Sequence, residues 1–303
     1  MQTHITELKS NLILVKTNNP YSQWNNRTIA KAYKTGKLFK VWRGSYIKSS
    51  YFQSLGINDK KLLRIIAAKS AVDKNMILSH ASAARFHNLG VLQQENLVYF
   101  RSPNNQQTHS KLLKYYRYQD QANIVITEIG LVTTIVQTVV DCAREMNFIE
   151  ALVIADSARN KGCMVKDIYT ILENSKFKRG RRKVEAVLEH SSSKSDSVAE
   201  TIARFNLYII GMPSPELQKE LFYEGHRYRV DIAYPEYSLI VEVDGKQKYF
   251  ELTDDIKETL YHEKLRQDII ERNGWKIVRL TWSDIHNFDK LRYLFGNYIS
   301  NNR

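Results

Sequence analysis

Cysteine is scarce in this chain of 303 residues, and it contains no hydrophobic run of membrane-spanning length. The two cysteines, Cys142 and Cys163, are too few to form a zinc finger by themselves and favour a reducing compartment. No apolar run approaches the roughly 20 residues that cross a bilayer, and the first residues do not follow a secretory-signal pattern. We therefore expect a soluble, cytoplasmic protein with no membrane partner.

Acidic residues are scarce at the start of the chain, where residues 1–60 contain only Glu7 and Asp59. The net charge is +13. Residues 1–190 carry more than the whole of this excess, and residues 191–303 are close to neutral. This division predicts a first part that binds a polyanion such as nucleic acid and a second part whose chemistry needs carboxylates. The alternative is a solvated basic surface that binds nothing specific.

The length predicts two or three domains. Residues 176–197 hold a basic cluster, a short helical piece and then a serine-rich polar stretch, whose lack of apolar periodicity predicts a linker. We place the main boundary near 190–195 and divide the chain into residues 1–60, 61–190 and 191–303. The middle segment shows no catalytic set, and we expect its His80 and His87 to serve packing rather than metal binding.

Residues 26–48 predict a helix that stops at Gly36 and is followed by two short strands around a tight turn. This order is typical of a winged helix-turn-helix, which binds duplex DNA. Basic side chains on such a module would contact phosphate, although a solvated lysine-rich helix is the alternative. The candidate DNA-binding residues are Arg27, Lys31, Lys34, Lys37, Lys40, Arg43, Arg179, Arg181 and Arg182.

Residues 191–303 predict the order helix, three strands, helix, strand, helix. The short turns indicate an antiparallel meander, and the long helix indicates a crossover to a parallel strand. We therefore expect a mixed sheet flanked by helices, in an α/β (α+β) protein overall. Trp275, at the start of the fourth strand, is expected in the core on an inner strand.

Three acids interrupt the apolar strands of this part. In "SLIVEVDG", alternation places Glu242 and Asp244 on one face, and Asp231 on the neighbouring strand can join them. Like charges about 4 Å apart repel by about 4 kcal/mol at an effective dielectric near 20, so a cation would relieve the cluster. Clustered oxygen ligands suit Mg²⁺ or Mn²⁺, which can activate water, and Lys246 and Lys248 follow closely. The alternative is a salt-bridged end of the sheet.

The motifs "RVDIAYPEYSLIVEVDGKQKY" and "KLRQDIIERNGWKIVRLTW" resemble the PD-(D/E)xK superfamily, in the branch related to very-short-patch-repair endonucleases. The resemblance covers residues 195–299. It implies a restriction-endonuclease-like fold, a metal held by Asp231, Glu242 and Asp244, and Glu200 on the preceding helix as a further catalytic acid. The chain departs from the pattern by having Asp244 where a lysine is usual and Lys248 where a histidine is common.

Glu200 has a second interpretation. It stands three residues after Ser197, as in a capping box, and four residues before Arg204, with which it could form an ion pair.

The front of the chain, roughly residues 5–185, resembles the AbiEi-type antitoxin family through "NRTIAKAYKTGKLFKVWRGSYI", "ILSHASAARFHNLG" and "TTIVQTVVDCA". This resemblance implies a DNA-binding winged helix, a cognate toxin or other defence partner, and a setting in phage defence. Two hypotheses follow. One is a Mg²⁺-dependent endonuclease acting on DNA; the other is a DNA-binding regulator or antitoxin with an inactive nuclease fold. A homodimer is compatible with both.

Overall fold

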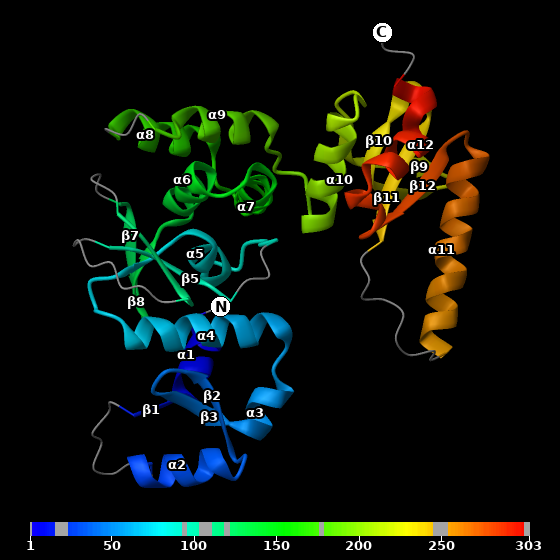
Figure 1. Cartoon of the computed structure of the whole chain (residues 1–303). Helices are drawn as coiled ribbons and strands as arrows, with labels where there is room; N and C mark the ends of the chain where they lie inside the picture. The colour runs from blue at the N-terminus through cyan, green and yellow to red at the C-terminus, as the bar shows by residue number, and fades with distance from the viewer. Residues whose placement is uncertain are drawn as a thin grey trace. The chain divides into compact units, whose positions relative to one another are not determined.

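The computed structural model describes residues 2–15, 24–92, 96–102, 111–117, 122–175, 179–244 and 254–299. The chain forms two compact units (Figure 1). Unit 1 comprises Met1–Glu145 and Lys166–Arg181, and unit 2 comprises Met146–Val165 and Arg182–Arg303. This division differs from the three segments expected from sequence, because residues 146–165 and 182–190 belong with the C-terminal part. In the described part of the chain, no helix is both long and apolar enough to span a membrane.

Unit 1 begins with a small three-stranded antiparallel sheet in the order β1-β3-β2. The helix before the hairpin, α2, starts at a capping box in which Asn25 and Thr28 exchange hydrogen bonds of 2.8 and 2.9 Å. Ile29 of this helix packs against Leu38 in a small core. The helix and the two strands lie where the sequence predicted them. The elements are α1 (Gln2–Ser10), β1 (Ile13–Leu14), α2 (Asn26–Lys34), β2 (Leu38–Trp42), β3 (Ser45–Lys48), α3 (Ser49–Ser54) and α4 (Ile57–Ala71).

The rest of unit 1 holds a five-stranded mixed sheet in the order β6-β5-β4-β8-β7. As expected, both histidines of this region serve packing. His80 is fully buried and stacks on Tyr116, and Nε2 of His87 lies 2.7 Å from the Thr133 carbonyl oxygen. The elements are β4 (Ile77–Leu78), α5 (His80–Phe86), β5 (Val98–Arg101), β6 (Leu113–Tyr116), β7 (Ile124–Thr127), β8 (Gly130–Thr133), α6 (Ile135–Glu145) and α8 (Val165–Asn174).

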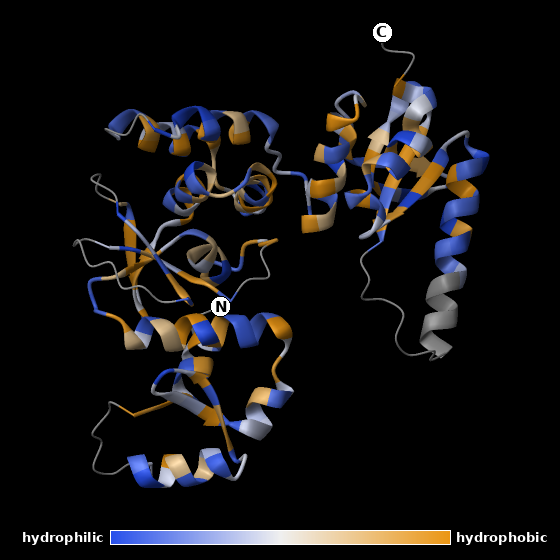
Figure 2. Ribbon diagram, in the orientation of Figure 1, coloured by the Kyte–Doolittle hydropathy of each residue, from blue (hydrophilic) through white to orange (hydrophobic). Residues whose placement is uncertain are grey.

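Unit 2 contains a four-stranded sheet in the order β12-β11-β10-β9, in which only β11 and β12 run parallel. Figure 1 shows α10 and α11 on opposite sides of this sheet, and Figure 2 shows apolar residues concentrated on its strands. The predicted meander, crossover and mixed sheet are confirmed. The elements are α7 (Phe148–Asn160), α9 (Arg181–His190), α10 (Val198–Ile209), β9 (Glu216–Tyr223), β10 (His226–Tyr234), β11 (Leu239–Asp244), α11 (Asp254–Arg272), β12 (Lys276–Thr281) and α12 (Phe288–Ile299).

One prediction about this sheet is wrong. Strand β12 lies at the edge rather than inside the sheet, and Trp275 at its start is half-buried. The indole packs beside a core that includes Ile240 and Ile270, and its Nε1 donates a hydrogen bond of 2.8 Å to the Tyr223 hydroxyl. An edge strand has a neighbour on one side only, so the residue that leads into it keeps solvent contact.

Candidate functional site

The acids singled out in the sequence come from three elements of unit 2. Glu200 lies in the first turn of α10, Asp231 lies on β10, and Glu242 and Asp244 lie on β11. The ladder between β10 and β11 ends at the pair Ile232 and Val241, so Asp231 and Glu242 stand next, where the strands separate. Against the larger effect of burial, which raises the pKa of Asp231, the backbone N–H of Val243 on β11 lowers it, so this N–H lies close to the Asp231 carboxylate. The opening of the strand pair therefore brings Asp231 to β11.

Two of these carboxyl groups titrate abnormally. Burial raises the pKa of Asp231 and the charge of Glu242 raises it further, against the backbone N–H of Val243 and the charges of Arg266 and Arg229. Burial also raises the pKa of Glu200; a hydrogen bond from the Asp196 N–H opposes this, and the charge of Asp231 adds to it. The charges of Asp231 and Glu242 thus act on each other's site, and that of Asp231 also acts on Glu200. Positive charge brought among them would relieve this repulsion.

Glu242 is a paired carboxylate. Its Oε1 lies 2.7 Å from Arg266 and its Oε2 lies 3.2 Å from Nε of Arg279. The same two arginines contact Glu263 at 3.1 and 2.7 Å. This is the arrangement that a salt-bridged end of a sheet would have. Sequence reasoning missed Arg279. This residue lies on the parallel strand β12 and pairs with Glu242 in the ladder, so the predicted parallel strand was the signal that could have found it.

Asp244 is exposed at the end of β11, where it stands in register with Thr281 of β12. The two lysines that follow, Lys246 and Lys248, lie outside the described residues.

Glu200 is fixed by hydrogen bonds rather than by an ion pair. Ser197 caps α10 by accepting from the Glu200 backbone N–H at 3.1 Å. The Glu200 Oε2 accepts from the backbone N–H of Asp196 at 2.9 Å and from Nε2 of Gln218 at 3.0 Å. The expected capping box is therefore displaced by one residue, from Ser197 to Asp196. The expected pair with Arg204 is not formed, because that guanidinium binds Asp156 instead.

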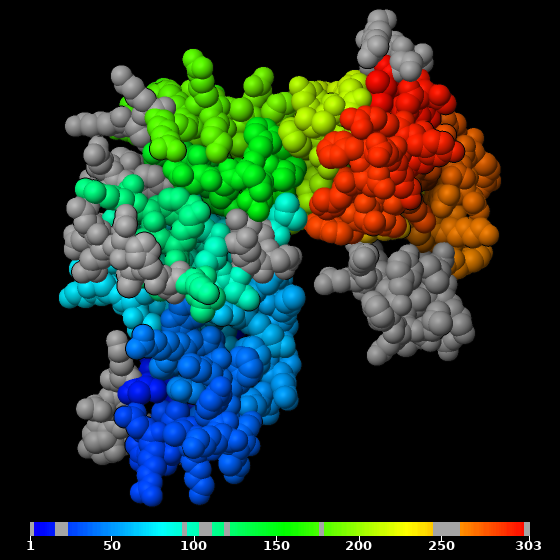
Figure 3. Space-filling view, viewed as in Figure 1, coloured from blue at the N-terminus to red at the C-terminus, as the bar shows by residue number. Residues whose placement is uncertain are grey.

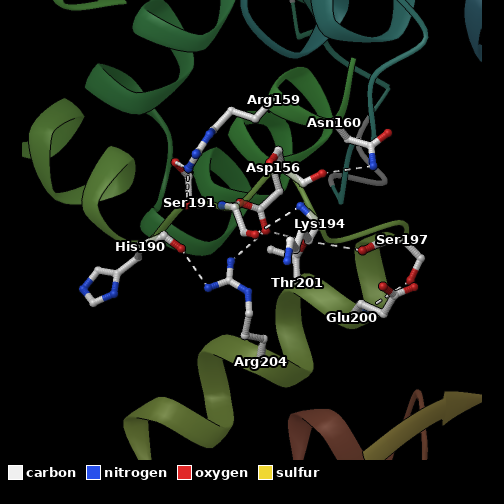
Figure 4. A network of polar contacts seen from close by, with 12 residues as sticks. Asp156, Arg159, Asn160, His190, Ser191, Lys194, Ser197, Glu200, Thr201 and Arg204 are labelled. Carbon is white, nitrogen blue, oxygen red and sulfur yellow. Dashed lines mark hydrogen bonds and ion pairs between the residues drawn. The ribbon is translucent and has the colours of Figure 1, made fainter. Parts of the chain in front are cut away.

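Buried Asp156 binds both α10 and the segment that leads into it (Figure 4). Its carboxylate accepts from the backbone N–H of Ser192 at 2.7 Å, from the Thr201 hydroxyl at 2.9 Å and from Arg204 at 2.7 Å. Arg204 also donates to the His190 carbonyl oxygen at 2.8 Å. The serine-rich stretch that the sequence predicted to be a linker is therefore a bonded connection. Its composition could not reveal this, because its partner lies some 36 residues earlier in α7.

The donor atoms of the acid site are oxygens. Among the described side chains, no group of three or more His, Cys, Asp or Glu residues is arranged to hold a metal ion. Asp231 and Glu242 remain as a carboxylate pair, and Oε1 of Gln218 is buried without a hydrogen-bond partner in the described structure. Mg²⁺ is commonly held by one or two carboxylates together with waters and substrate phosphates. Asp231 and Glu242 are thus the carboxylates that would hold Mg²⁺ or Mn²⁺, with Glu242 exchanging an arginine contact for the cation, and the described side chains do not form the predicted set of three.

The basic residues of α2 form one exposed face. Arg27, Lys31 and Lys34 follow one another at helical spacing, while Ile29 and Ala32 on the other side of the helix are buried. In the described structure, none of these three cations forms an ion pair with an acidic side chain. Figure 2 shows hydrophilic residues along α2, and Figure 3 shows the blue segment that contains it on the surface.

The other predicted DNA contacts differ in exposure. Lys37, Lys40 and Arg43, around β2, are exposed, as are Arg179 and Arg182. Arg181 is half-buried and donates a hydrogen bond of 3.2 Å to the Leu172 carbonyl oxygen, so part of its binding capacity is used inside unit 1.

The fold defines a mixed α/β protein, and comparisons with known proteins add distant relatives. No family model matches the chain. The uncharacterized proteins Rv2248 and MT2308, from the H37Rv and CDC 1551 strains of Mycobacterium tuberculosis, are each 26% identical to it over 157 residues. The match covers 51% of this chain and 56% of each relative, so the chain spans about half the length of the curated relatives it matches. The crystal structure of the Rv2827c protein from the same species has a TM-score of 0.40 at 11% identity, over 73% of this chain and 87% of that one.

Proposed function

We propose that this protein is a metal-dependent DNA endonuclease that hydrolyses phosphodiester bonds and binds duplex DNA through an N-terminal winged-helix module. The observation that carries the proposal is that Asp231 and Glu242 stand at neighbouring positions where β10 and β11 separate, with Glu200 of α10 near enough for the charge of Asp231 to raise its pKa. Carboxylates held together where burial already raises their pKa disfavour folding. Such groups are typical of functional sites. The sequence resemblance to the PD-(D/E)xK superfamily supports the same assignment.

In this proposal Asp231 and Glu242 hold Mg²⁺ or Mn²⁺, which supplies an activated water and balances the charge of the phosphate. The guanidinium groups of Arg266 and Arg279 stand beside Glu242 and suit binding of phosphate oxygens. Glu200, Asp244, Lys246 and Lys248 remain candidate catalytic residues. The basic face of α2, with Lys37, Lys40 and Arg43 near it in sequence, suits phosphate contacts along a DNA groove.

A nicking assay tests the proposal. Supercoiled plasmid and duplex oligonucleotides are incubated with the full chain in Mg²⁺, Mn²⁺ or EDTA. We expect nicking that needs the cation and is lost in Asp231→Asn, which keeps size and a hydrogen-bond acceptor. Asp289→Asn, on an almost fully exposed aspartate of the same unit, is the matched control and should nick like wild type. A wild-type protein that cleaves no nucleic acid with either cation would refute the proposal.

A second function is favoured by the ion pairs of Glu242. Both of its oxygens are taken by arginines, and the described residues form no three-ligand group. A DNA-binding regulator or antitoxin with an inactive nuclease fold, acting with a toxin or defence partner and as a homodimer, would keep such pairs permanently. It would bind duplex DNA without nicking it, and divalent cations would leave its melting temperature unchanged.

A further inference from the structure

Gln218 of β9 contacts the carboxylate of Glu200 from the strand that follows α10 in sequence. Its Nε2 donates to Glu200 Oε2 at 3.0 Å, and the Asp196 N–H donates to the same oxygen at 2.9 Å. The carboxylate is thus held by two donors from different elements (its place at the start of α10 is seen in Figure 4). The other end of the Gln218 amide, Oε1, is buried and has no hydrogen-bond partner among the described residues.

The backbone at Gln218 is also unusual. Its φ is +53°, in the left-handed region that residues other than glycine rarely adopt. The ladder pairs that flank it, Val230 with Lys219 and Ile232 with Leu217, leave Gln218 and Asp231 facing each other without a regular pairing. Backbone strain of this kind collects at functional sites, where the surroundings hold it in place. The interruption falls at the position where β9 meets the acid site.

Gln218 also lines an open depression of about 570 Å³, together with Ser192, Lys194 and residues 215–217 and 219–220. A buried acceptor without a partner is uncommon in proteins and commonly finds a water or a ligand. An amide suits this place, because it gives Glu200 a donor without adding a negative charge beside two carboxylates.

We propose that Gln218 is a positioning residue of the acid site, whose Nε2 fixes the orientation of the Glu200 carboxylate and whose Oε1 accepts a hydrogen bond from a water or ligand in the depression that Gln218 lines. The inference rests on the proposed endonuclease function, and it adds Glu200 to Asp231 and Glu242 as a carboxylate that would bind the same cation. Without the Nε2 donor, Glu200 keeps only its contact with the Asp196 backbone, and its carboxylate can rotate about it.

The test uses the full chain with two substitutions. Gln218→Met keeps the length of the side chain without polar atoms, and Gln218→Glu keeps its shape but removes the donor. Gln267→Met is the matched control, because Gln267 makes the same kind of contact, at 2.8 Å, with Glu271 rather than with an acid of the site. Mn²⁺ affinity is measured by isothermal titration calorimetry, and kcat and KM are measured for plasmid nicking. The melting temperature in EDTA reports on the fold.

We expect both Gln218 variants to bind Mn²⁺ about 10- to 100-fold more weakly, as loss of a partner that orients a ligand does. Their kcat should fall while KM for DNA and the melting temperature in EDTA stay at the wild-type values, and Gln267→Met should match wild type throughout. If Gln218→Met does not fold, the isosteric Gln218→Glu decides. Wild-type Mn²⁺ affinity in the folded variants overturns this inference alone, whereas a wild type that neither binds Mn²⁺ nor nicks DNA overturns the proposed function as well.

Discussion

A guanidinium nitrogen of Arg266 lies 2.7 Å from Oε1 of Glu242, so the acid at the centre of the candidate site is already neutralised within the protein. Arg279 contacts the second oxygen of the same carboxylate. Asp231, next to it, forms no ion pair with a described residue, and its pKa is raised by burial and by Glu242. Neighbouring acids with such different partners should respond in opposite ways to substitution.

Glu242→Gln should destabilise the protein. The change leaves Arg266, whose side chain is 22% exposed, without its strongest partner. Breaking a buried ion pair from one side costs about 3–5 kcal/mol, and partial exposure reduces this, so we expect about 1–3 kcal/mol. Urea unfolding measures the change, with exposed Glu236→Gln of the same unit as control. Equal stability of Glu242→Gln and wild type would show that the two ion pairs contribute nothing.

Asp231→Asn should stabilise the protein at neutral pH. Because its pKa is raised above the ordinary value of 3.8, the folded state holds the proton to higher pH than the unfolded state does. The free energy of unfolding therefore falls as pH rises from the unfolded-state pKa of Asp231 to its folded-state pKa. Above the folded-state pKa, the ionised carboxylate destabilises the protein by a constant amount. Melting curves of wild type and variant should converge in acid and separate at neutral pH. A variant that melts lower than wild type at neutral pH would contradict the assignment.

The same pair of proteins reports on the cation. Mg²⁺ or Mn²⁺ binding to the folded state should raise the melting temperature of wild type in a concentration-dependent way, and should not raise that of Asp231→Asn. Ca²⁺ is the comparison cation, because it binds oxygen ligands with looser geometry than Mg²⁺ does. A rise of equal size in both proteins would place the bound cation elsewhere in the chain.

Asp156→Ala should be strongly destabilising. It removes the acceptor shared by Ser192, Thr201 and Arg204 and leaves a guanidinium whose side chain is 12% exposed. The expected loss is about 3–5 kcal/mol in the free energy of unfolding. Asp289→Ala, at an exposed position of the same unit, should change little. If Asp156→Ala unfolds like wild type in urea, residues 191–197 are the flexible linker that their composition indicates.

Substitutions on α2 should change the salt dependence of DNA binding. Removing one cation that touches a phosphate lowers the slope of log affinity against log salt by about 0.9 for duplex DNA. Lys31→Ala should therefore weaken binding to all duplex sequences alike and reduce the slope by about 1. Lys166→Ala, on an exposed lysine of α8, is the control. A slope unchanged by Lys31→Ala would remove this helix face from the DNA interface.

Much of unit 2 could be predicted because its signals are local. Apolar residues and short turns mark β9, β10 and β11, and a glycine after α11 ends the helix before β12. The acids of the strands could be named for the same reason. Their partners could not, because Asp156 pairs with Arg204 over 48 positions and Glu242 with Arg279 over 37. Gln218 carried no signal in sequence, since its role depends on a positive φ and on an interrupted ladder.

Unit 2 is assembled from two stretches of chain, because the chain leaves it after Val165 and returns at Arg182. Cleavage by a protease within residues 166–181 would therefore break the polypeptide without releasing a fragment. The two pieces would still be joined by the contacts of Asp156 with Ser192, Thr201 and Arg204. Such a nicked protein should run as two bands on a denaturing gel and elute as one particle from a sizing column.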